Sequence, residues 1–290
     1  MAARYEVIQT DDPLENHLLV DHETKARVAL APGRGGMVTR FRVGETNVLY
    51  LDPATLHDPT KNVRGGIPIL FPIAGRLTQD RFVLDGKVHS LFQHGFARAL
   101  PWAIVDQSTA DGARMVLELT PTAATRAQFP FEFRAVATYV LAAGRLTIGL
   151  RYTNASNVSM PISPGLHPYF FVPDAEKATS RLMTDAVSAF DNRTGQATTL
   201  RGPIDLAAEE VDLQLYDHWP RSVRLVRHGD RDLDLGLGLP DGVLVVWTVR
   251  GKDYVCVEPW TAPGDALNQG KAVWVPPRGT HETTFSIAVL

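Results

Sequence analysis

Alternation of polar and apolar residues dominates this chain. Residues 232–239 alternate Asp or Gly with Leu, as expected for a strand with one buried face. Similar alternating or β-branched runs occupy 114–120, 134–141, 145–152, 222–226, 242–249, 253–259 and 283–290, and shorter ones occupy 26–32, 37–43, 47–51 and 81–91. The pattern therefore predicts many short strands.

Turn signals separate these runs. Asp85-Gly86 divides 81–91 and predicts a hairpin, while 142–144 and 239–242 are short connectors between runs. Helical periodicity is scarce, with room for a turn or two at 121–130 and 205–213. Closely spaced strands favour a sandwich or barrel, and no repeat or linker marks a boundary. We predict one all-β domain covering residues 1–290, built from antiparallel sheets.

Composition narrows the possible partners. The 290 residues are 44% hydrophobic and 21% charged, which is enough apolar material for a large core. The formal net charge of −3 gives no basic face for nucleic acid. The single cysteine, Cys256, can form no internal disulfide and supplies no cysteine cluster for zinc.

Targeting and membrane signals are not found. The first residues lack the apolar stretch of a secretory signal. The longest run without Asp, Glu, Lys or Arg, 152–173, contains four prolines and His167, unlike a membrane helix. We expect a cytoplasmic protein with no membrane partner.

Four segments place ionisable groups among Gly, Pro and aromatic residues, namely 63–77, 91–102, 162–172 and 255–270. In the last, period two puts Cys256 and Glu258 on one face of a strand that ends beside Pro and Trp. Glu258 is either a solvated strand end or a partly desolvated general base. His167 and His94 are either packed, hydrogen-bonded residues or groups that exchange protons near neutral pH.

Arginines accompany these segments. Arg64, Arg76 and Arg98 are either surface residues or ligands of sugar hydroxyls or a phosphate. HExxH, CxxC, GxSxG and Walker motifs are missing, and no GxGxxG precedes a helix. The sequence therefore predicts neither a metal site nor a cofactor.

Four motifs, taken in order, carry a family resemblance. They are RGGIPILFP (64–72), QHGFAR (93–98) followed by Pro101-Trp102, LHPYF (166–170) and CVEPWTAPGDALNQG (256–270). Together they resemble the aldose 1-epimerase (galactose mutarotase) superfamily, including its hexose-6-phosphate mutarotase branch, over residues 25–290. The resemblance implies a large β-supersandwich with a sugar cleft on one concave face. It also implies an isomerase of carbohydrate metabolism that interconverts the α and β anomers of aldoses without a cofactor.

The resemblance assigns roles to individual residues. Glu258 falls on the catalytic base, His167 on the catalytic acid, and His94 on a second active-site histidine that holds the ring region of the sugar. Arg76 resembles the sugar-binding arginine, although Gly75 stands where the family often has Asn. Asp212 is the candidate for an aspartate that binds sugar hydroxyls.

Aromatic residues near these groups are candidate walls for the apolar face of a sugar. Phe170 and Trp260 are two such residues, with core packing as their alternative role.

The chemistry agrees with these residue types. Anomer exchange removes the proton of the C1 hydroxyl and protonates the ring oxygen, so one base and one acid suffice. The leading hypothesis is an aldose 1-epimerase acting on a free hexose, as a monomer or homodimer. One alternative is a hexose-6-phosphate mutarotase, because Arg64 and Arg98 could clamp a phosphate. The other is a catalytically silent sugar-binding module.

Overall fold

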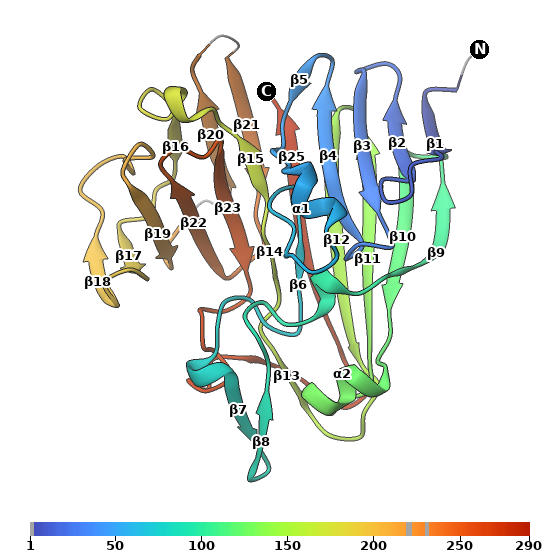
Figure 1. Ribbon diagram of the computed structural model, residues 1–290, viewed down its shortest axis with the longest axis vertical. Coiled ribbons are helices and arrows are strands. Elements are labelled where there is room, and N and C mark those ends of the chain that lie inside the picture. The colour runs from blue at the N-terminus through green and yellow to red at the C-terminus, as the bar shows by residue number, and fades with distance from the viewer. Residues whose placement is uncertain (1–2, 219–221, 230–231) are drawn as a thin grey trace.

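Three large sheets form the part of the chain that the computed structural model describes, residues 3–218, 222–229 and 232–290 (Figure 1). Their strand pairs are antiparallel, which confirms the predicted all-β class. The first sheet comprises, in spatial order, β1 (Tyr5–Gln9), β2 (His17–Asp21), β3 (Ala26–Ala31), β4 (Met37–Val43) and β5 (Thr46–Asn47).

The second sheet contains the longest strands. Along β12, Leu146, Ile148, Leu150 and Tyr152 are buried while the residues between them are at least partly exposed, as alternation predicts. Its spatial order is β16 (Arg181–Met183), β20 (Ser222–Arg227), β21 (Leu233–Gly238), β25 (Thr280–Val289), β12 (Arg145–Asn154), β11 (Phe133–Ala142), β10 (Ala113–Leu119) and β9 (Ala103–Ser108).

The third sheet is built around β23, whose residues are buried along its whole length. Its order is β18 (Gln196–Thr199), β17 (Ser188–Asp191), β19 (Glu210–Leu215), β22 (Val243–Val249), β23 (Tyr254–Trp260), β14 (Gly165–Leu166) and β6 (Ile69–Leu70), with β15 (Tyr169–Phe171) also paired to β23. We call it the site sheet.

Small elements complete the described chain. They are the hairpin β7 (Arg81–Leu84) and β8 (Lys87–Ser90), the pair β13 (Met160–Ile162) and β24 (Val273–Val275), the helices α1 (Pro53–His57) and α2 (Ala123–Gln128), and 3₁₀ turns at Thr78–Asp80, Ala97–Ala99 and Asp174–Glu176. No helix in the described ranges is both long and apolar enough to cross a membrane.

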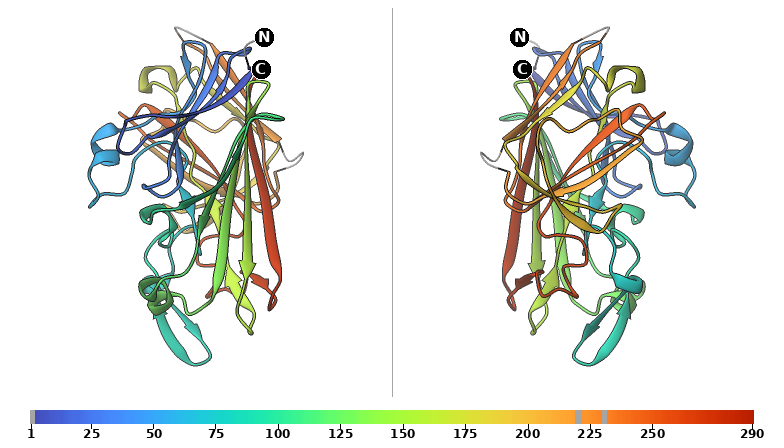
Figure 2. Two further views of the ribbon diagram at one scale, coloured as in Figure 1. Left: turned by 90° about the vertical axis from the view of Figure 1, so that its right-hand side faces the viewer. Right: turned by 90° about the vertical axis from the view of Figure 1, so that its left-hand side faces the viewer.

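One apolar core joins the three sheets. Strands β1 to β3 lie against β10 and β11, so the first sheet covers part of the second (Figure 2). Buried residues from all three sheets meet in the same cluster, among them Leu30, Tyr152 and Val257. Burial of such side chains stabilises the fold by about 1.5–3 kcal/mol each. The site sheet therefore has one face fixed against this core.

Most predicted strands are present, with two local corrections. The Asp85-Gly86 hairpin and the helical turn within 121–130 are confirmed by β7–β8 and α2. The helical turns predicted at 205–213 are wrong, because 210–215 form β19 in the middle of the site sheet. The run 47–51 forms only the end of β5 and isolated bridges, including Leu49 with Phe170.

Candidate active site

Strand β23 directs its polar side chains away from the main core. Val255 and Val257 pack into the main core cluster, whereas Cys256, Glu258 and Trp260 project from the other face. Alternation within 253–259 predicted this arrangement for Cys256 and Glu258. Glu258 is only 1% exposed, so it is not the solvated strand end that was its alternative role.

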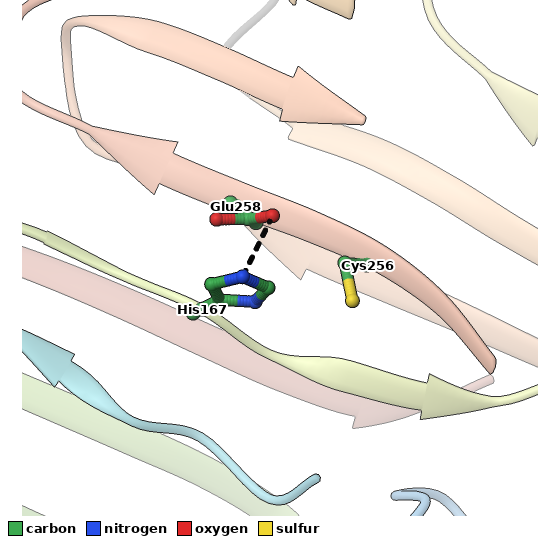
Figure 3. A group of neighbouring side chains, drawn as sticks. All are labelled: His167, Cys256 and Glu258. Atoms are coloured by element: carbon green, nitrogen blue, oxygen red, sulfur yellow. Dashed lines mark ion pairs between the residues drawn. The ribbon is translucent and has the colours of Figure 1, made fainter. Parts of the chain in front are cut away.

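His167 lies opposite Glu258. The residues two before and two after His167 pair with Trp260 and Cys256, which places the imidazole beside the carboxylate across the strand boundary. The distance from His167 Nε2 to Glu258 Oε1 is 3.4 Å, and Figure 3 shows the two groups facing each other. Two predicted site residues 91 positions apart are thus brought into contact.

The Glu258 carboxylate is held at one oxygen and faces His167 with the other. Trp260 Nε1 donates a hydrogen bond to Oε2 at 3.1 Å. Burial raises the pKa of Glu258 well above its usual value, and the charge of Asp212 acts in the same direction. The Trp260 hydrogen bond and the charge of Arg98 oppose that rise in pKa, because both stabilise the ionised form.

The His167 ring is enclosed by other rings. It stacks on Tyr169 with centroids 4.6 Å apart and meets His94 edge-on at 5.4 Å. Burial lowers the pKa of His167 well below its usual value, and the surrounding positive charges add to this. Its Nδ1 is buried and has no hydrogen-bond partner among the described residues.

His94 is fixed by a reciprocal contact with Gly75. The His94 amide donates to the Gly75 carbonyl at 2.8 Å, and the Gly75 amide donates to His94 Nδ1 at 3.1 Å. Because Nδ1 accepts a hydrogen bond, the proton of the neutral ring is on Nε2. Burial and the charges of three nearby arginines lower the pKa of His94 to about 3. His94 is therefore a neutral hydrogen-bond donor.

The backbone around His94 is tightly constrained. His94 has φ 68° and Gly95 has φ 64°, both in the left-handed region. A Cβ on Gly95 would lie 2.3 Å from the Phe71 carbonyl oxygen, so only glycine fits. The energetic cost of the His94 conformation is of order 1–3 kcal/mol, which the packed surroundings must offset.

Arg64 and Arg98 lie beside the histidine–glutamate pair. Burial lowers the pKa of Arg98, and the charge of Arg64 acts in the same direction, so the two guanidinium groups are near neighbours. Arg64 lies over the Trp247 ring at 5.7 Å and contacts the Tyr169 hydroxyl. Two adjacent cations are typical of a site for an anion.

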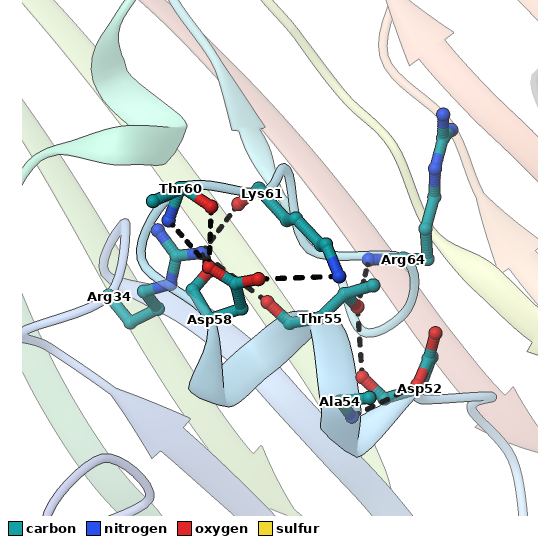
Figure 4. A network of polar contacts seen from close by, with 8 residues as sticks. All are labelled: Arg34, Asp52, Ala54, Thr55, Asp58, Thr60, Lys61 and Arg64. Carbon is teal, nitrogen blue, oxygen red and sulfur yellow. Dashed lines mark hydrogen bonds and ion pairs between the residues drawn. The ribbon is translucent and has the colours of Figure 1, made fainter.

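A third arginine, Arg34, fixes the segment that carries Arg64 (Figure 4). Its guanidinium is buried and donates to the carbonyls of Leu56, Thr55, Asp58 and Lys61 at 2.6–3.4 Å.

The hydroxyl of Thr55 accepts a hydrogen bond from the Arg64 amide at 2.9 Å. In Figure 4 the Arg64 side chain extends away from this polar network. Nothing in the local sequence distinguishes Arg34 from a surface arginine, so its role could not be predicted.

Arg76 lies at the margin of the cluster that contains Glu258, His167 and His94. Its side chain is 68% exposed, and its Nε is 3.6 Å from Asp80. Its charge still acts on His94. The predicted sugar-binding role of Arg76 therefore stays a prediction.

Asp212 belongs to a separate polar network on the site sheet. Asn192 Nδ2 donates to Asp212 Oδ1 at 2.6 Å, Gln214 Nε2 donates to Asn192 Oδ1 at 2.6 Å, and Gln214 Oε1 accepts from the Gly264 amide at 3.1 Å. Burial raises the pKa of Asp212. The charge of Asp212 acts on Glu258, so the Asp212 carboxylate lies near the pair of Glu258 and His167. The predicted binding of sugar hydroxyls by Asp212 stays a prediction.

The two aromatic residues predicted to line the sugar site, Trp260 and Phe170, lie on opposite faces of the site sheet. Trp260 lies on the polar face of β23 and contacts Glu258. The prediction for Phe170 is wrong: it is 0% exposed inside the main core, because it points opposite to Tyr169 along β15. Tyr169 and Trp247 line the site face instead, and the same alternation could have identified Tyr169.

Sequence spacing predicted no metal site, but three potential ligands converge in the fold. His167, Cys256 and Glu258 each offer a ligand atom, and these atoms lie within 4.8 Å of one another. Cys256 is fully buried against Tyr169 and Tyr254, and burial raises the pKa of its thiol. The thiol is therefore a packing group rather than a nucleophile at neutral pH.

Comparisons with known proteins identify relatives by sequence. Two proteins named "Putative glucose-6-phosphate 1-epimerase" are 29% identical over 199 residues (Escherichia coli K12) and 30% identical over 198 residues (Salmonella typhimurium LT2). In both cases the match covers 61% of this chain and 61% of the relative, so the chain spans about three fifths of their length.

A solved structure and a family model cover more of the chain. The Slr1438 protein from Synechocystis sp. PCC 6803 is 41% identical, with a TM-score of 0.91 over 97% of both chains. The family model described as aldose 1-epimerase matches residues 17–272. This match includes His94, His167 and Glu258. The chain therefore belongs to the aldose 1-epimerase family.

Proposed function

We propose that this protein interconverts the α and β anomers of an aldohexose by opening and closing the sugar ring. The observation that carries the proposal is the buried contact between Glu258 Oε1 and His167 Nε2 at 3.4 Å. A base and an acid this close can act on two oxygens attached to the same sugar carbon, the C1 hydroxyl and the ring oxygen.

Each proton transfer can be assigned to one atom. Glu258 takes the proton of the C1 hydroxyl, and the electron pair of that O–H bond forms the C1 carbonyl. The bond between C1 and the ring oxygen breaks, and its electron pair takes a proton from His167. After rotation about C1–C2, the transfers run in reverse and close the ring on the other face, so the protein regains its starting protonation.

The pair needs one proton for this cycle. Burial favours the uncharged form, with the proton on Glu258, because it raises the pKa of Glu258 and lowers that of His167. The reactive form has the proton on His167. Trp260 and Arg98 favour it by stabilising the carboxylate, so they set how readily the reactive form is populated.

His94 complements the pair without exchanging a proton. Its ring is neutral and carries its hydrogen on Nε2, so it donates a hydrogen bond to a sugar oxygen. Its edge-on contact with His167 supports a position close to the ring oxygen. We propose that it orients the sugar and stabilises negative charge that develops there.

A phosphorylated hexose is the second candidate substrate. Arg64 and Arg98 place two neighbouring guanidinium groups beside the acid–base pair, and the charge of Arg64 lowers the pKa of Arg98. A sugar phosphate would place an anion between these two charges and receive bidentate hydrogen bonds. The names of the two bacterial relatives agree with this reading.

Anomerisation of freshly dissolved sugars tests the proposal. Polarimetry or anomer-resolved NMR would follow α-glucose, α-galactose and glucose 6-phosphate with the wild type, Glu258→Gln and the control Glu45→Gln, whose carboxylate is exposed. We expect acceleration by the wild type and the control, and a loss of about 10²–10⁴-fold in Glu258→Gln.

The other outcomes distinguish an aldose 1-epimerase from a sugar-phosphate epimerase and from a sugar-binding module without activity. Unchanged rates in Glu258→Gln would refute its role as base. No acceleration of any of the three sugars, combined with binding, would favour a catalytically silent sugar-binding module. A preference for glucose 6-phosphate that disappears in Arg64→Ala or Arg98→Ala would identify the phosphosugar as the substrate.

We also propose one cytoplasmic domain, acting as a monomer or homodimer. The core shared by the three sheets supports a single domain. One cooperative transition in thermal unfolding, with size-exclusion chromatography for the oligomeric state, tests this part.

A further inference from the structure

We propose that Cys256, His167 and Glu258 form a binding site for a thiophilic divalent cation, Zn²⁺ or Cd²⁺, and that the bound cation inhibits the enzyme. The binding part stands on the geometry alone. The inhibition part rests on the proposed function, because the cation would occupy the proposed base and acid.

The first support is the convergence of three ligand atoms. They come from a thiol, an imidazole and a carboxylate and lie within 4.8 Å of one another. Bonds of about 2.0–2.3 Å around a tetrahedral ion leave neighbouring ligand atoms about 3.5 Å apart. His167 Nε2 and Glu258 Oε1 are already 3.4 Å apart, so only the Cys256 sulfur must move inward.

The imidazole presents one nitrogen to the cluster, because a single ring binds one ion through one nitrogen. The His167 side chain is only 8% exposed, and Figure 3 shows its ring facing Glu258 with Cys256 beside it. When Nε2 binds the ion, the ring hydrogen lies on Nδ1, which is buried without a hydrogen-bond partner among the described residues. An unsatisfied buried donor costs about 1–3 kcal/mol, which the three metal bonds must exceed.

The Glu258 carboxylate is already oriented for a ligand. Trp260 holds Oε2 at 3.1 Å and leaves Oε1 for the cation, as outer hydrogen bonds commonly do in metal sites. The positive charges of Arg64 and Arg98 oppose a free cation here. A thiolate and a carboxylate together cancel the two charges of the ion, so the filled site adds no net charge beside the arginines.

The donor set selects the metal. Sulfur and imidazole ligands suit Zn²⁺ and Cd²⁺, whereas Mg²⁺ and Ca²⁺ require oxygen ligands. On binding, the thiol and the Glu258–His167 pair each lose one proton to solvent, a sulfur–metal bond forms, and no oxidation occurs. The cation would occupy Glu258 Oε1 and His167 Nε2, the two atoms proposed to exchange protons with the sugar. Cation and sugar therefore exclude each other.

Binding is tested without reference to catalysis. Purified full-length protein is titrated with Cd²⁺, and the ultraviolet charge-transfer absorption of a cadmium–thiolate bond is recorded. We expect a stoichiometric signal in the wild type and none in Cys256→Ser or Cys256→Ala. The matched control is His22→Gln, which removes an exposed His–Glu pair at 2.9 Å. It should leave the signal unchanged.

Inhibition is tested in the anomerisation assay. Zn²⁺ should inhibit the wild type competitively with sugar, and a chelator should restore the rate. Cys256→Ser should remain active and lose at least about 100-fold in sensitivity to Zn²⁺, since even outer-shell changes cost 10–100-fold in metal affinity.

Three results would overturn the site: no cadmium–thiolate signal in the wild type, an unchanged signal in folded Cys256→Ser, or a signal lost in His22→Gln. Circular dichroism establishes that each variant is folded, and Cys256→Ala replaces the serine variant if that one does not fold. A normal cadmium signal in a protein that accelerates no sugar would refute the proposed function and leave the metal site standing.

Discussion

Trp260→Phe isolates the contact that tunes the proposed base. The substitution keeps an aromatic ring beside Glu258 but removes the indole N–H that donates to Oε2 at 3.1 Å. That hydrogen bond stabilises the ionised carboxylate and therefore lowers its pKa. Without it, the pKa of Glu258 rises further and the carboxylate is ionised only at higher pH.

The size of the effect follows from the charge on the acceptor. A hydrogen bond to a charged group contributes about 1.5–3 kcal/mol, and about 1.4 kcal/mol corresponds to one pH unit. Because the singly protonated pair holds its proton mainly on Glu258, the loss of that proton sets the alkaline limb of the pH profile of kcat/KM. We therefore expect the alkaline limb to move upward by about one to two pH units and the plateau to fall by about 10–100-fold, since less of the pair has its proton on His167.

Anomerisation rates from acid to alkaline pH, corrected for the spontaneous reaction, measure this shift. The matched control is Trp247→Phe, because the Trp247 indole donates to Glu210 at 3.2 Å and not to Glu258. Its alkaline limb should stay in place. A limb that stays fixed in folded Trp260→Phe, or that shifts equally in both variants, would refute the assignment of Glu258 as the titrating base.

Three further substitutions probe the surroundings. Phe170→Ala should lower the free energy of unfolding by about 3–5 kcal/mol in denaturant titrations, because the ring is fully buried in the core. The KM of the folded fraction should not change, and a raised KM would indicate that Phe170 contacts the sugar after all. Gly95→Ala should reduce kcat and thermal stability together, since its Cβ would lie 2.3 Å from the Phe71 carbonyl oxygen. Normal activity with normal stability would contradict that clash. Arg34→Met should raise KM for glucose 6-phosphate more than KM for glucose, because Arg34 holds the segment that carries Arg64. Equal changes for both sugars would limit Arg34 to a structural role.

Local periodicity was sufficient to predict most of the strands, because a strand with one buried face has an apolar residue at every second position. The prediction failed where the alternating run is short. The segment 205–213 begins with turns and acidic residues, which resemble a helix start, yet the strand begins at Glu210. Its alternation of Val211, Leu213 and Leu215 spans too few residues to outweigh that signal. The pairing with β22 settles the conformation, and a single sequence does not contain that pairing.

In the candidate site, too, local sequence predicts which face of a strand a side chain occupies but not which residue it meets on the neighbouring strand. Alternation alone places Cys256 and Glu258 on one face, but the contact between Glu258 and His167 depends on the register of β14 and β15 against β23. A Cβ on Gly165 would lie 2.7 Å from the Trp260 ring, so glycine is what allows β14 to pair there. A slip of one residue would bring Val257 opposite His167 and direct the carboxylate into the apolar core. The proposed acid–base pair is therefore as much a property of strand register as of the two residues that form it.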